Sequence, residues 1–437
     1  MTTLTFPLSR IEGHARVEIE VRDGRVLSTR FQAMEKRGFS LMVKGVPAEQ
    51  MPVIVPRICG VCSTAHHVAA VKALEHAYGI QPPPLARRVR ELLLLGQIIQ
   101  NQATSLFIFT MPDRLGADSI FHVSEQEANP EVQFNIARGA LKLRQLGTDL
   151  ITLAGGQFIH PVKAVVGGVS SGIQAQQAEV FMERVQSALP GACRLVELYW
   201  DISQRMKERI GSWGDDQPAY YITSTTRDKP AYDSDIIRVM TPAGECCQEF
   251  SAEQFRQVLS FEETDYSYAG RTSYQGGVMR ANSLARANMT RRLGTPLADG
   301  FLCRLRMEYG HPAHPILLFD LCRGIELVYA LERAAAMLVE PLEGDETDLP
   351  YTPRDGQGWG LVEAPRGPLI HHYVIKDGLV ETGEFIIPTV HNMLAIERAL
   401  RVAAERYITT EAVDLELERA VGRVVRAFDP CIACATH

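Results

Sequence analysis

The stretch Arg57-Ile58-Cys59-Gly60-Val61-Cys62-Ser63-Thr64-Ala65-His66 carries the first of two Cys-x-x-Cys pairs in this chain. The second pair lies in Asp429-Pro430-Cys431-Ile432-Ala433-Cys434-Ala435-Thr436-His437, at the other end of the 437 residues. A Cys-x-x-Cys turn directs two thiolates at one metal ion, so two such turns supply four sulfur ligands. If both pairs share one site, the two ends of the chain must meet. We therefore expect residues 1–437 to form a single compact unit with its N- and C-terminal segments at the metal site.

The spacing alone leaves the identity of the metal open. Four thiolates are typical ligands of zinc and of iron–sulfur centres, so a structural zinc protein with four cysteine ligands is one hypothesis. The other cysteines show no cluster spacing, and we expect them to be buried as small hydrophobic residues. The total of nine cysteines is odd, which argues against a disulfide framework. The five outside the pairs are at positions 193, 246, 247, 303 and 322.

Composition excludes several classes of function. Hydrophobic residues make up 46% of the chain and charged residues 22%, as is ordinary for a soluble globular protein. The net charge of −7 offers no basic surface for nucleic acid. No window approaches 18 uninterrupted apolar residues, so we expect no direct membrane span. The N-terminus has no signal-peptide pattern, which makes the cytoplasm the default location, although a partner subunit could carry a signal for the periplasm.

Hydrophobic periodicity predicts a mainly α fold with small β-hairpins, in the α+β class. Two hairpins are expected, one over 15–31 around Asp23-Gly24 and one over 369–387 around Asp377-Gly378. The segment 212–300 is mixed and has no clear pattern. Helices of the predicted length and number indicate a central bundle. The helices are expected over 65–78, 84–108, 128–153, 174–210, 316–338, 391–406 and 411–427.

The residues around the cysteine pairs resemble the two signature motifs of the nickel–iron hydrogenase large subunit, RxCGxCxxxH and DPCxxCxxH. The resemblance covers the chain from end to end. It implies the fold of that family and an oxidoreductase activity, the reversible cleavage of H2 into protons and electrons. The further motifs, in family order, are Arg10-Ile11-Glu12-Gly13-His14, Gly156-Gln157-Phe158-Ile159-His160-Pro161, Glu363-Ala364-Pro365-Arg366-Gly367, and Pro388-Thr389 with Asn392.

The resemblance also implies a nickel–iron centre. Cys59 and Cys431 would be terminal nickel ligands, and Cys62 and Cys434 would bridge nickel to iron. The iron would carry CO and cyanide ligands that maturation proteins install. Soft sulfur ligands suit a redox-active nickel ion.

A magnesium ion near the C-terminus is a further implication of the resemblance. His437 would bind it after proteolytic removal of a C-terminal extension. Relatives often supply a metal-binding Glu nineteen residues before the first cysteine. Here that position is Ser40, which departs from the usual magnesium site.

Proton transfer has candidate residues by the same resemblance. Splitting H2 into a hydride and a proton needs a base within hydrogen-bond reach, and we expect Cys431 to be that base. Glu12 would take the proton next. Arg366, held by Asp429, is a rival base, but a guanidinium is better suited to electrostatic support. The alternatives are a merely solvated Glu12 and a structural Arg366–Asp429 pair.

Other side chains are expected to surround the metals. His66 would donate to a bridging sulfur, and Thr389 would donate its hydroxyl to an iron-bound cyanide. Pro365 and Pro388 would shape a dry pocket, with a role in turns as the alternative. His67 matches no motif and is expected in packing or at the surface.

A second departure from the family is Gln100-Asn101-Gln102, where many relatives have His-Asp-His or Gln-Ser-His. Asn101 cannot supply the pocket carboxylate of the former group.

Electrons must leave the site, yet the remaining cysteines offer no cluster. A separate iron–sulfur small subunit is therefore implied, with further electron-transfer subunits left open. By length the chain is closer to the soluble cytoplasmic hydrogenases than to the periplasmic ones. Two alternatives use the same fold: an H2-sensing subunit with slow turnover, and a relative of respiratory complex I, which would lack the cysteines.

Overall fold

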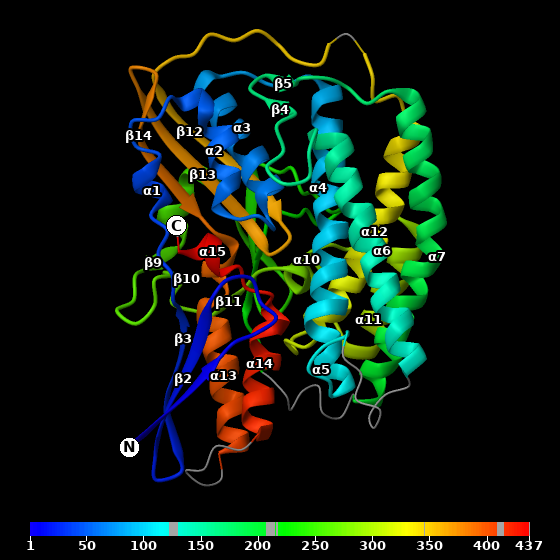
Figure 1. Cartoon of the computed structure of the whole chain (residues 1–437). Helices are drawn as coiled ribbons and strands as arrows, with labels where there is room; N and C mark the ends of the chain where they lie inside the picture. The colour runs from blue at the N-terminus through cyan, green and yellow to red at the C-terminus, as the bar shows by residue number, and fades with distance from the viewer. Residues whose placement is uncertain (122–129, 207–214, 216, 345, 409–414, 437) are drawn as a thin grey trace.

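Four long helices form the main hydrophobic core. A computed structural model describes residues 1–121, 130–206, 215, 217–344, 346–408 and 415–436. In Figure 1 the four helices stand side by side, with α4 against α6 and α12, and α12 against α7. Their apolar faces meet in one buried cluster, as expected for a helix bundle. They are α4 (Pro84–Ala103), α6 (Pro130–Gly155), α7 (Ala175–Arg205) and α12 (Leu318–Val339).

Helix α4 runs through the middle of this core. Glycines bring it close to α6, because a Cβ atom on Gly147 would lie 2.5 Å from the backbone nitrogen of Gln100. Beyond Ala103 the helix continues as a π-helical stretch, Thr104–Thr110, and then as α5 (Met111–Leu115). The whole stretch Pro84–Leu115 is long and apolar enough to cross a membrane, but 83% of its most apolar window is buried inside the protein. It is therefore packed as a core helix.

A three-stranded antiparallel sheet lies beside the bundle and holds the first cysteine pair in place (Figure 1). Its strands are β12 (Gly356–Ala364), β13 (Gly367–Lys376) and β14 (Leu379–Ile386). Helix α3 (Ser63–Tyr78) starts directly after Cys62 and packs on β12. Cβ atoms on Gly358 and Gly360 would lie 2.0 Å from the carbonyl oxygens of Ala73 and Ala69, so only glycine permits this contact.

A second three-stranded sheet carries the N-terminal segment. Strands β1 (Thr2–Pro7), β2 (Ala15–Arg22) and β3 (Arg25–Ala33) are antiparallel, and the apolar side chains of β2 are buried alternately. Helix α13 (Met393–Tyr407) packs on β3 and against α14 (Leu415–Phe428). The last helix, α15 (Ile432–Ala435), follows α14 and lies near the middle of the molecule in Figure 1.

The remaining elements are short and connect these three parts. A four-stranded sheet has the order β11-β6-β7-β8, with β6 (Tyr220–Thr223), β7 (Ile236–Met240), β8 (Cys246–Ser251) and β11 (Met279–Arg280). Two-stranded pairs are β4 (Ala164–Val165) with β5 (Gly168–Val169), and β9 (Ser260–Glu262) with β10 (Arg271–Ser273). The other helices are α1 (Phe39–Met42), α2 (Met51–Ile54), α9 (Phe255–Val258), α10 (Ser283–Met289) and α11 (Pro296–Tyr309).

The predicted fold class is confirmed: the chain is mainly helical with small sheets. Both predicted Asp-Gly turns are present, with left-handed φ values of 49° at Asp23 and 53° at Asp377. The helices predicted from periodicity lie within a few residues of the observed ones, although 128–129, 207–210 and 411–414 fall outside the described residues. Helix α10 and the start of α11 at Pro296 lie in the segment 212–300, and neither was predicted.

The expectation that all five other cysteines are buried is wrong. Cys322 is buried, Cys193 and Cys246 are half-buried, and Cys247 and Cys303 are exposed. Cys247 is the extra, unpaired residue of β8 where the register between β7 and β8 shifts. Because β8 is an edge strand, neighbouring strands do not fully cover the Cys247 side chain. None of the nine cysteines is disulfide-bonded in this structure.

Replacement of Gly360 by alanine tests the contact between α3 and β12. The new methyl group would clash with the carbonyl oxygen of Ala69, and we expect a loss of about 1–3 kcal/mol in the free energy of unfolding. Gly300→Ala in α11 is the matched control, because its Cβ would meet nothing within 4 Å. That variant should gain about 0.5–1 kcal/mol from helix propensity. Equal thermal unfolding midpoints for the two variants would contradict this packing.

Candidate metal centre

Four cysteine sulfurs from the two ends of the chain converge in the interior. The Sγ atoms of Cys59, Cys62, Cys431 and Cys434 all lie within 4.8 Å of one another, and all four residues are buried. Cys59 follows the turn Val55–Ile58, and Cys62 caps α3. Cys431 caps α15, and Cys434 lies within it. Within the described ranges, no other group of three or more cysteine, histidine or acidic ligands comes together in this way.

The distances between the sulfurs depart from those of a regular zinc site. A regular tetrahedron around zinc, with Zn–S bonds of ~2.3 Å, would have edges of about 3.8 Å. Cys59–Cys431 and Cys62–Cys431 are near that value, at 3.5 and 3.7 Å. Cys434, however, lies only 2.8 Å from Cys62 and 2.9 Å from Cys431. Both of these edges are shorter than a regular zinc tetrahedron would have.

The pKa values of the four thiols indicate that a bound cation is needed to ionise all of them. Hydrogen bonds from the neighbouring thiols, Cys431 first, lower the pKa of Cys59 well below its ordinary value. Burial raises the pKa of Cys62, Cys431 and Cys434. By themselves the four sulfurs therefore favour a single thiolate, and bound metal cations would displace the remaining protons. Buried, polarizable thiolates are a donor set that fits nickel and iron.

Glu12 brings the N-terminal segment to the same sulfurs. Its backbone forms a parallel bridge with Cys431, and its carbonyl oxygen accepts the N–H of Ile432 at 3.1 Å. Its carboxylate Oε2 accepts the Cys431 thiol at 3.0 Å and the N–H of Ala433 at 3.1 Å. Burial, and then the negative charge of Cys59, raise the pKa of Glu12. The carboxyl group is thus in hydrogen-bond contact with a predicted metal ligand.

Asp113 in α5 ties this N-terminal segment to the last long helix. The Arg10 guanidinium donates to Asp113 Oδ1 at 2.6 Å. Arg426 of α14 donates to both carboxylate oxygens of Asp113, at 2.7 and 2.8 Å, and to the carbonyl oxygen of Ser9 at 3.1 Å. One half-buried carboxylate therefore binds residues that are more than 400 positions apart. Asp113 was not predicted from the sequence, because nothing local marks an ion pair over such separations.

Arg366 lies in the two-residue turn between β12 and β13, next to the C-terminal cysteines. Its Nε donates to the Asp429 carbonyl oxygen at 2.5 Å, and its Nη2 donates to Asp429 Oδ1 at 3.1 Å. Burial opposes the charged form of Arg366, but Asp429 and the cysteine thiolates outweigh it and raise the pKa well above its usual range. Asn101 Nδ2 donates to the other oxygen, Asp429 Oδ2, at 3.2 Å. The predicted Arg366–Asp429 pair is therefore present, and the side-chain amide of Asn101 binds the same carboxylate.

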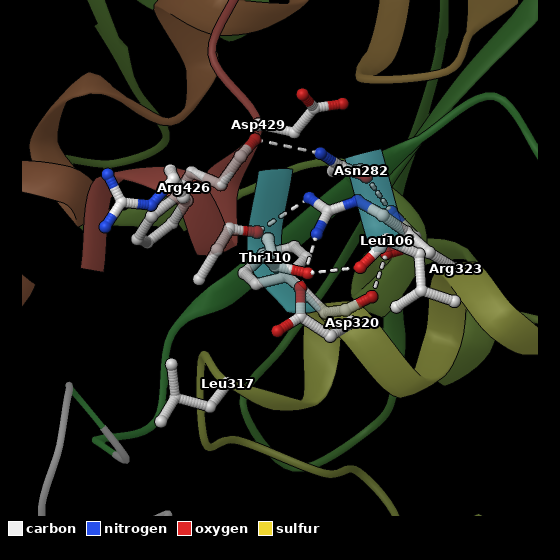
Figure 2. A network of polar contacts seen from close by, with 12 residues as sticks. Leu106, Thr110, Asn282, Leu317, Asp320, Arg323, Arg426 and Asp429 are labelled. Atoms are coloured by element: carbon white, nitrogen blue, oxygen red, sulfur yellow. Dashed lines mark hydrogen bonds and ion pairs between the residues drawn. The ribbon is translucent and has the colours of Figure 1, made fainter. Parts of the chain in front are cut away.

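Buried charges on α12 position the backbone that leads to Asp429 (Figure 2). Arg323 donates to the Ala427 carbonyl oxygen at 2.6 Å and to Asp320 Oδ1 at 2.9 Å. The side chain of Asn282 donates to the Phe428 carbonyl oxygen at 3.0 Å. Asp429 itself has a left-handed φ of 48°. These contacts fix the direction in which the chain enters the metal site.

Arg286 of α10 supports the turn that carries Arg366. It forms buried ion pairs with Glu326 and Glu363, at 2.5 and 2.8 Å. Its Nη2 also donates to the Pro365 carbonyl oxygen at 2.7 Å. Glu363 belonged to a motif in the sequence, whereas Arg286 and Glu326 carried no signal.

Of the other predicted residues, His66 and Thr389 contact the cysteines. His66 Nε2 is 3.4 Å from Cys434 Sγ. The Thr389 hydroxyl accepts the N–H of Cys431 at 3.0 Å and lies 3.4 Å from its carbonyl oxygen, so it holds the backbone of a ligand. Pro365 and Pro388 are both buried. His437 lies outside the described residues.

His67 has the packing role expected of it. Its Nδ1 lies 2.8 Å from the Pro52 carbonyl oxygen, and its Nε2 accepts the N–H of Ala164 at 3.2 Å. Burial lowers its pKa to about 4, so the ring is neutral.

Comparisons with known proteins agree on one family. A family model described as nickel-dependent hydrogenase matches residues 37–133 and 218–437, and one described as HoxL-like matches residues 5–35. The chain is 32% identical to one subunit of the F420-non-reducing hydrogenase vhu of Methanocaldococcus jannaschii, over 91% of this chain and 97% of that protein. It is 28% identical to the NAD-reducing hydrogenase HoxS subunit beta of Cupriavidus necator, over 99% and 93% of the two chains.

Solved structures show the same architecture. An NAD+-reducing [NiFe]-hydrogenase in the H2-reduced state superposes with a TM-score of 0.91 and 29% identity, covering 100% of both chains. A Ni-Fe-Se hydrogenase from D. vulgaris Hildenborough shares the fold, with a TM-score of 0.82 and 22% identity over 100% of both chains. Fold and thiolate site together define a hydrogenase large subunit. The chain belongs to the nickel-dependent hydrogenase family, and it is an oxidoreductase that acts on H2.

Replacement of Gly13 by alanine tests the contact between the two ends of the chain. Gly13 has a φ of +81°, and a Cβ atom there would lie 2.8 Å from Ile432 Cβ, so the variant should push Glu12 away from Cys431. We expect about 100-fold lower H2 oxidation, the cost of a displacement of about 1 Å in an active site. Gly24→Ala carries the same backbone strain, with φ +70° and nothing within 4 Å. Similar activities of the two variants would argue against this contact.

Proposed function

We propose that this chain cleaves H2 heterolytically and reversibly at a nickel–iron centre bound by Cys59, Cys62, Cys431 and Cys434. The observation that carries the proposal is the buried group of four sulfurs with a carboxylate 3.0 Å from one of them. Cys59 and Cys431 would bind nickel alone, and Cys62 and Cys434 would also bind iron. The iron would carry CO and cyanide ligands added by maturation proteins. When bound, this group supplies the Lewis acidity and the redox chemistry that split H2.

The chain's own residues would move the proton. The sulfur of Cys431 is the proposed base, because it would be a thiolate once bound to metal and it lies in direct contact with Glu12. Glu12 would receive the proton from that sulfur and release it outward, since its side chain is half-buried rather than enclosed. Its raised pKa brings the protonated form closer to neutral pH, which a proton carrier needs. The Ala433 N–H keeps the carboxyl group oriented during the transfer.

Arg366 would give electrostatic support and not act as the base. Its guanidinium is buried beside four sulfurs and is paired with Asp429. An Arg held in its charged form in this way is a poor proton acceptor, but it stabilises negative charge nearby. Thr389, Pro365 and Pro388 would line the same pocket, with Thr389 also available to a cyanide on iron.

An iron–sulfur small subunit is the proposed electron acceptor. The relatives carry names that describe single subunits of hydrogenases, and such names imply larger complexes. Apolar side chains are exposed near the first cysteine pair: Val53, Ile159 and Val162 have exposed fractions of 46%, 51% and 46%. The loop with Ile159 is joined to α3 by the His160 N–H and the Ser63 hydroxyl, 3.5 Å apart. We place the small subunit on this surface.

Location and organisation follow from the same proposal. We propose a cytoplasmic enzyme in which residues 1–437 act as one catalytic unit, since segments from both ends build the site. An H2-sensing role is the second candidate. It is favoured by Asn101, which places an amide against Asp429 where many relatives have a carboxylate.

Infrared spectroscopy of the matured complex tests the metal centre. The proposal predicts CO and cyanide stretching bands together with nickel, and more iron than nickel because the small subunit's clusters add iron. A spectrum without these bands, or zinc in place of nickel, would refute it. Rapid H2 oxidation with an artificial electron acceptor would then identify an enzyme, and turnover slower by orders of magnitude would assign the sensor role.

Replacement of Glu12 by glutamine tests the proton route. The amide keeps the shape and an acceptor for the Ala433 N–H but cannot carry a proton. We expect turnover to fall by about 10²–10⁴-fold while the nickel and iron contents persist. Glu405→Gln is the control, because Glu405 is exposed on α13 and paired only with Arg401 in the described structure. Unchanged turnover in E12Q would remove Glu12 from the mechanism.

A further inference from the structure

A chain of buried side chains continues from Cys434 away from the proton route. His66 Nε2 lies 3.4 Å from Cys434 Sγ, and His66 Nδ1 lies 2.9 Å from His371 Nε2. His371 Nδ1 lies 2.7 Å from the Tyr373 hydroxyl. His66 is at most 1% exposed, and His371 and Tyr373 are 0% exposed. Three aromatic rings therefore connect one metal ligand to the interior of β13.

Packing fixes the rings of this chain. His371 lies edge-on to Phe385 of β14, with ring centroids 4.9 Å apart, and is tilted against His66 at 5.1 Å. Tyr373 also packs against Phe385, at 6.3 Å. His371 and Tyr373 share one face of β13, two residues apart, while His66 reaches them from α3. The rings cannot turn away without disrupting this packing.

The hydrogen-bond directions follow from the hydroxyl group at the inner end. A buried tyrosine hydroxyl must donate its proton, and among the described residues His371 Nδ1 is the acceptor that lies in reach. If Nδ1 of neutral His371 accepts, its Nε2 carries the proton and donates to His66 Nδ1. The proton of neutral His66 is then on Nε2, which faces Cys434. Each hydrogen bond from Tyr373 through His371 and His66 is therefore donated in the direction of the Cys434 sulfur.

We infer that His371 and Tyr373 are positioning residues that hold His66 as an N–H donor to Cys434. The inference rests on the proposed function, because Cys434 must be a metal ligand for its hydrogen bond to affect the reaction. An N–H group bound to a thiolate withdraws electron density from the sulfur and thereby tunes the metals. Without Tyr373 the two imidazoles can adopt the opposite tautomers, which would turn a nitrogen lone pair toward Cys434.

The test compares the infrared spectra of four variants of the matured complex. Tyr373→Phe removes only the terminal hydroxyl, and His371→Leu removes the relay. His371→Gln keeps an N–H for His66 and an acceptor for Tyr373, so it is the conservative rescue. Tyr221→Phe is the matched control, because Tyr221 is buried and contacts His314 Nδ1 at 2.7 Å as a similar pair that does not join the four sulfurs.

Loss of the N–H donor should leave more electron density on Cys434 and the metals. We expect Y373F and H371L to move the CO band to lower wavenumber, with about 10-fold slower H2 oxidation and unchanged nickel and iron contents. H371Q and Y221F should keep the wild-type band positions. The same bands in Y373F and in the wild type would overturn the inference, as would loss of metal from every His371 and Tyr373 variant, H371Q included. A wild-type complex without CO and cyanide bands would instead refute the proposed metal centre, and this inference with it.

Discussion

The whole arrangement depends on one constraint: four cysteine side chains from opposite ends of the chain must meet at one buried site. Cys59 and Cys431 have their sulfurs 3.5 Å apart, and Cys62 and Cys434 have theirs 2.8 Å apart. Four buried sulfurs at such distances cannot all ionise without cations, so metals bound there would stabilise the fold. The protein must nevertheless bring the four thiols together by its own packing. The backbone bridge between Glu12 and Cys431 is the contact at which the two ends meet.

Buried and half-buried charges carry out much of this positioning. Asp113 binds Arg10 and Arg426, and Arg323 on α12 binds the carbonyl oxygen of Ala427, two residues before Asp429 (Figure 2). Buried ion pairs add little net stability, because the cost of removing the charges from water offsets their attraction. Their benefit is specificity, since they fix where the C-terminal segment enters the site. The pairing of Arg366 with Asp429 places a positive charge beside the sulfurs by the same means.

The sequence predicted the parts of this structure that have local patterns. Apolar periodicity located the long helices, and the Asp-Gly pairs located two hairpins. Strand β12 was not predicted. It is buried over most of its length, and Gly358 and Gly360 allow α3 to pack closely against it. Sequence motifs identified Glu12, Arg366 and Asp429 as candidate site residues. Their contacts with one another and with the cysteines follow from the fold. His371 and Asp113 had no pattern of their own, because their partners are distant in sequence.

Anomalous X-ray scattering from crystals of the matured complex, recorded at the nickel, iron and zinc absorption edges, would locate the metals. We expect a nickel peak among the four sulfurs and an iron peak beside Cys62 and Cys434. A zinc peak at the centre of the four sulfurs, without nickel or iron, would contradict this expectation.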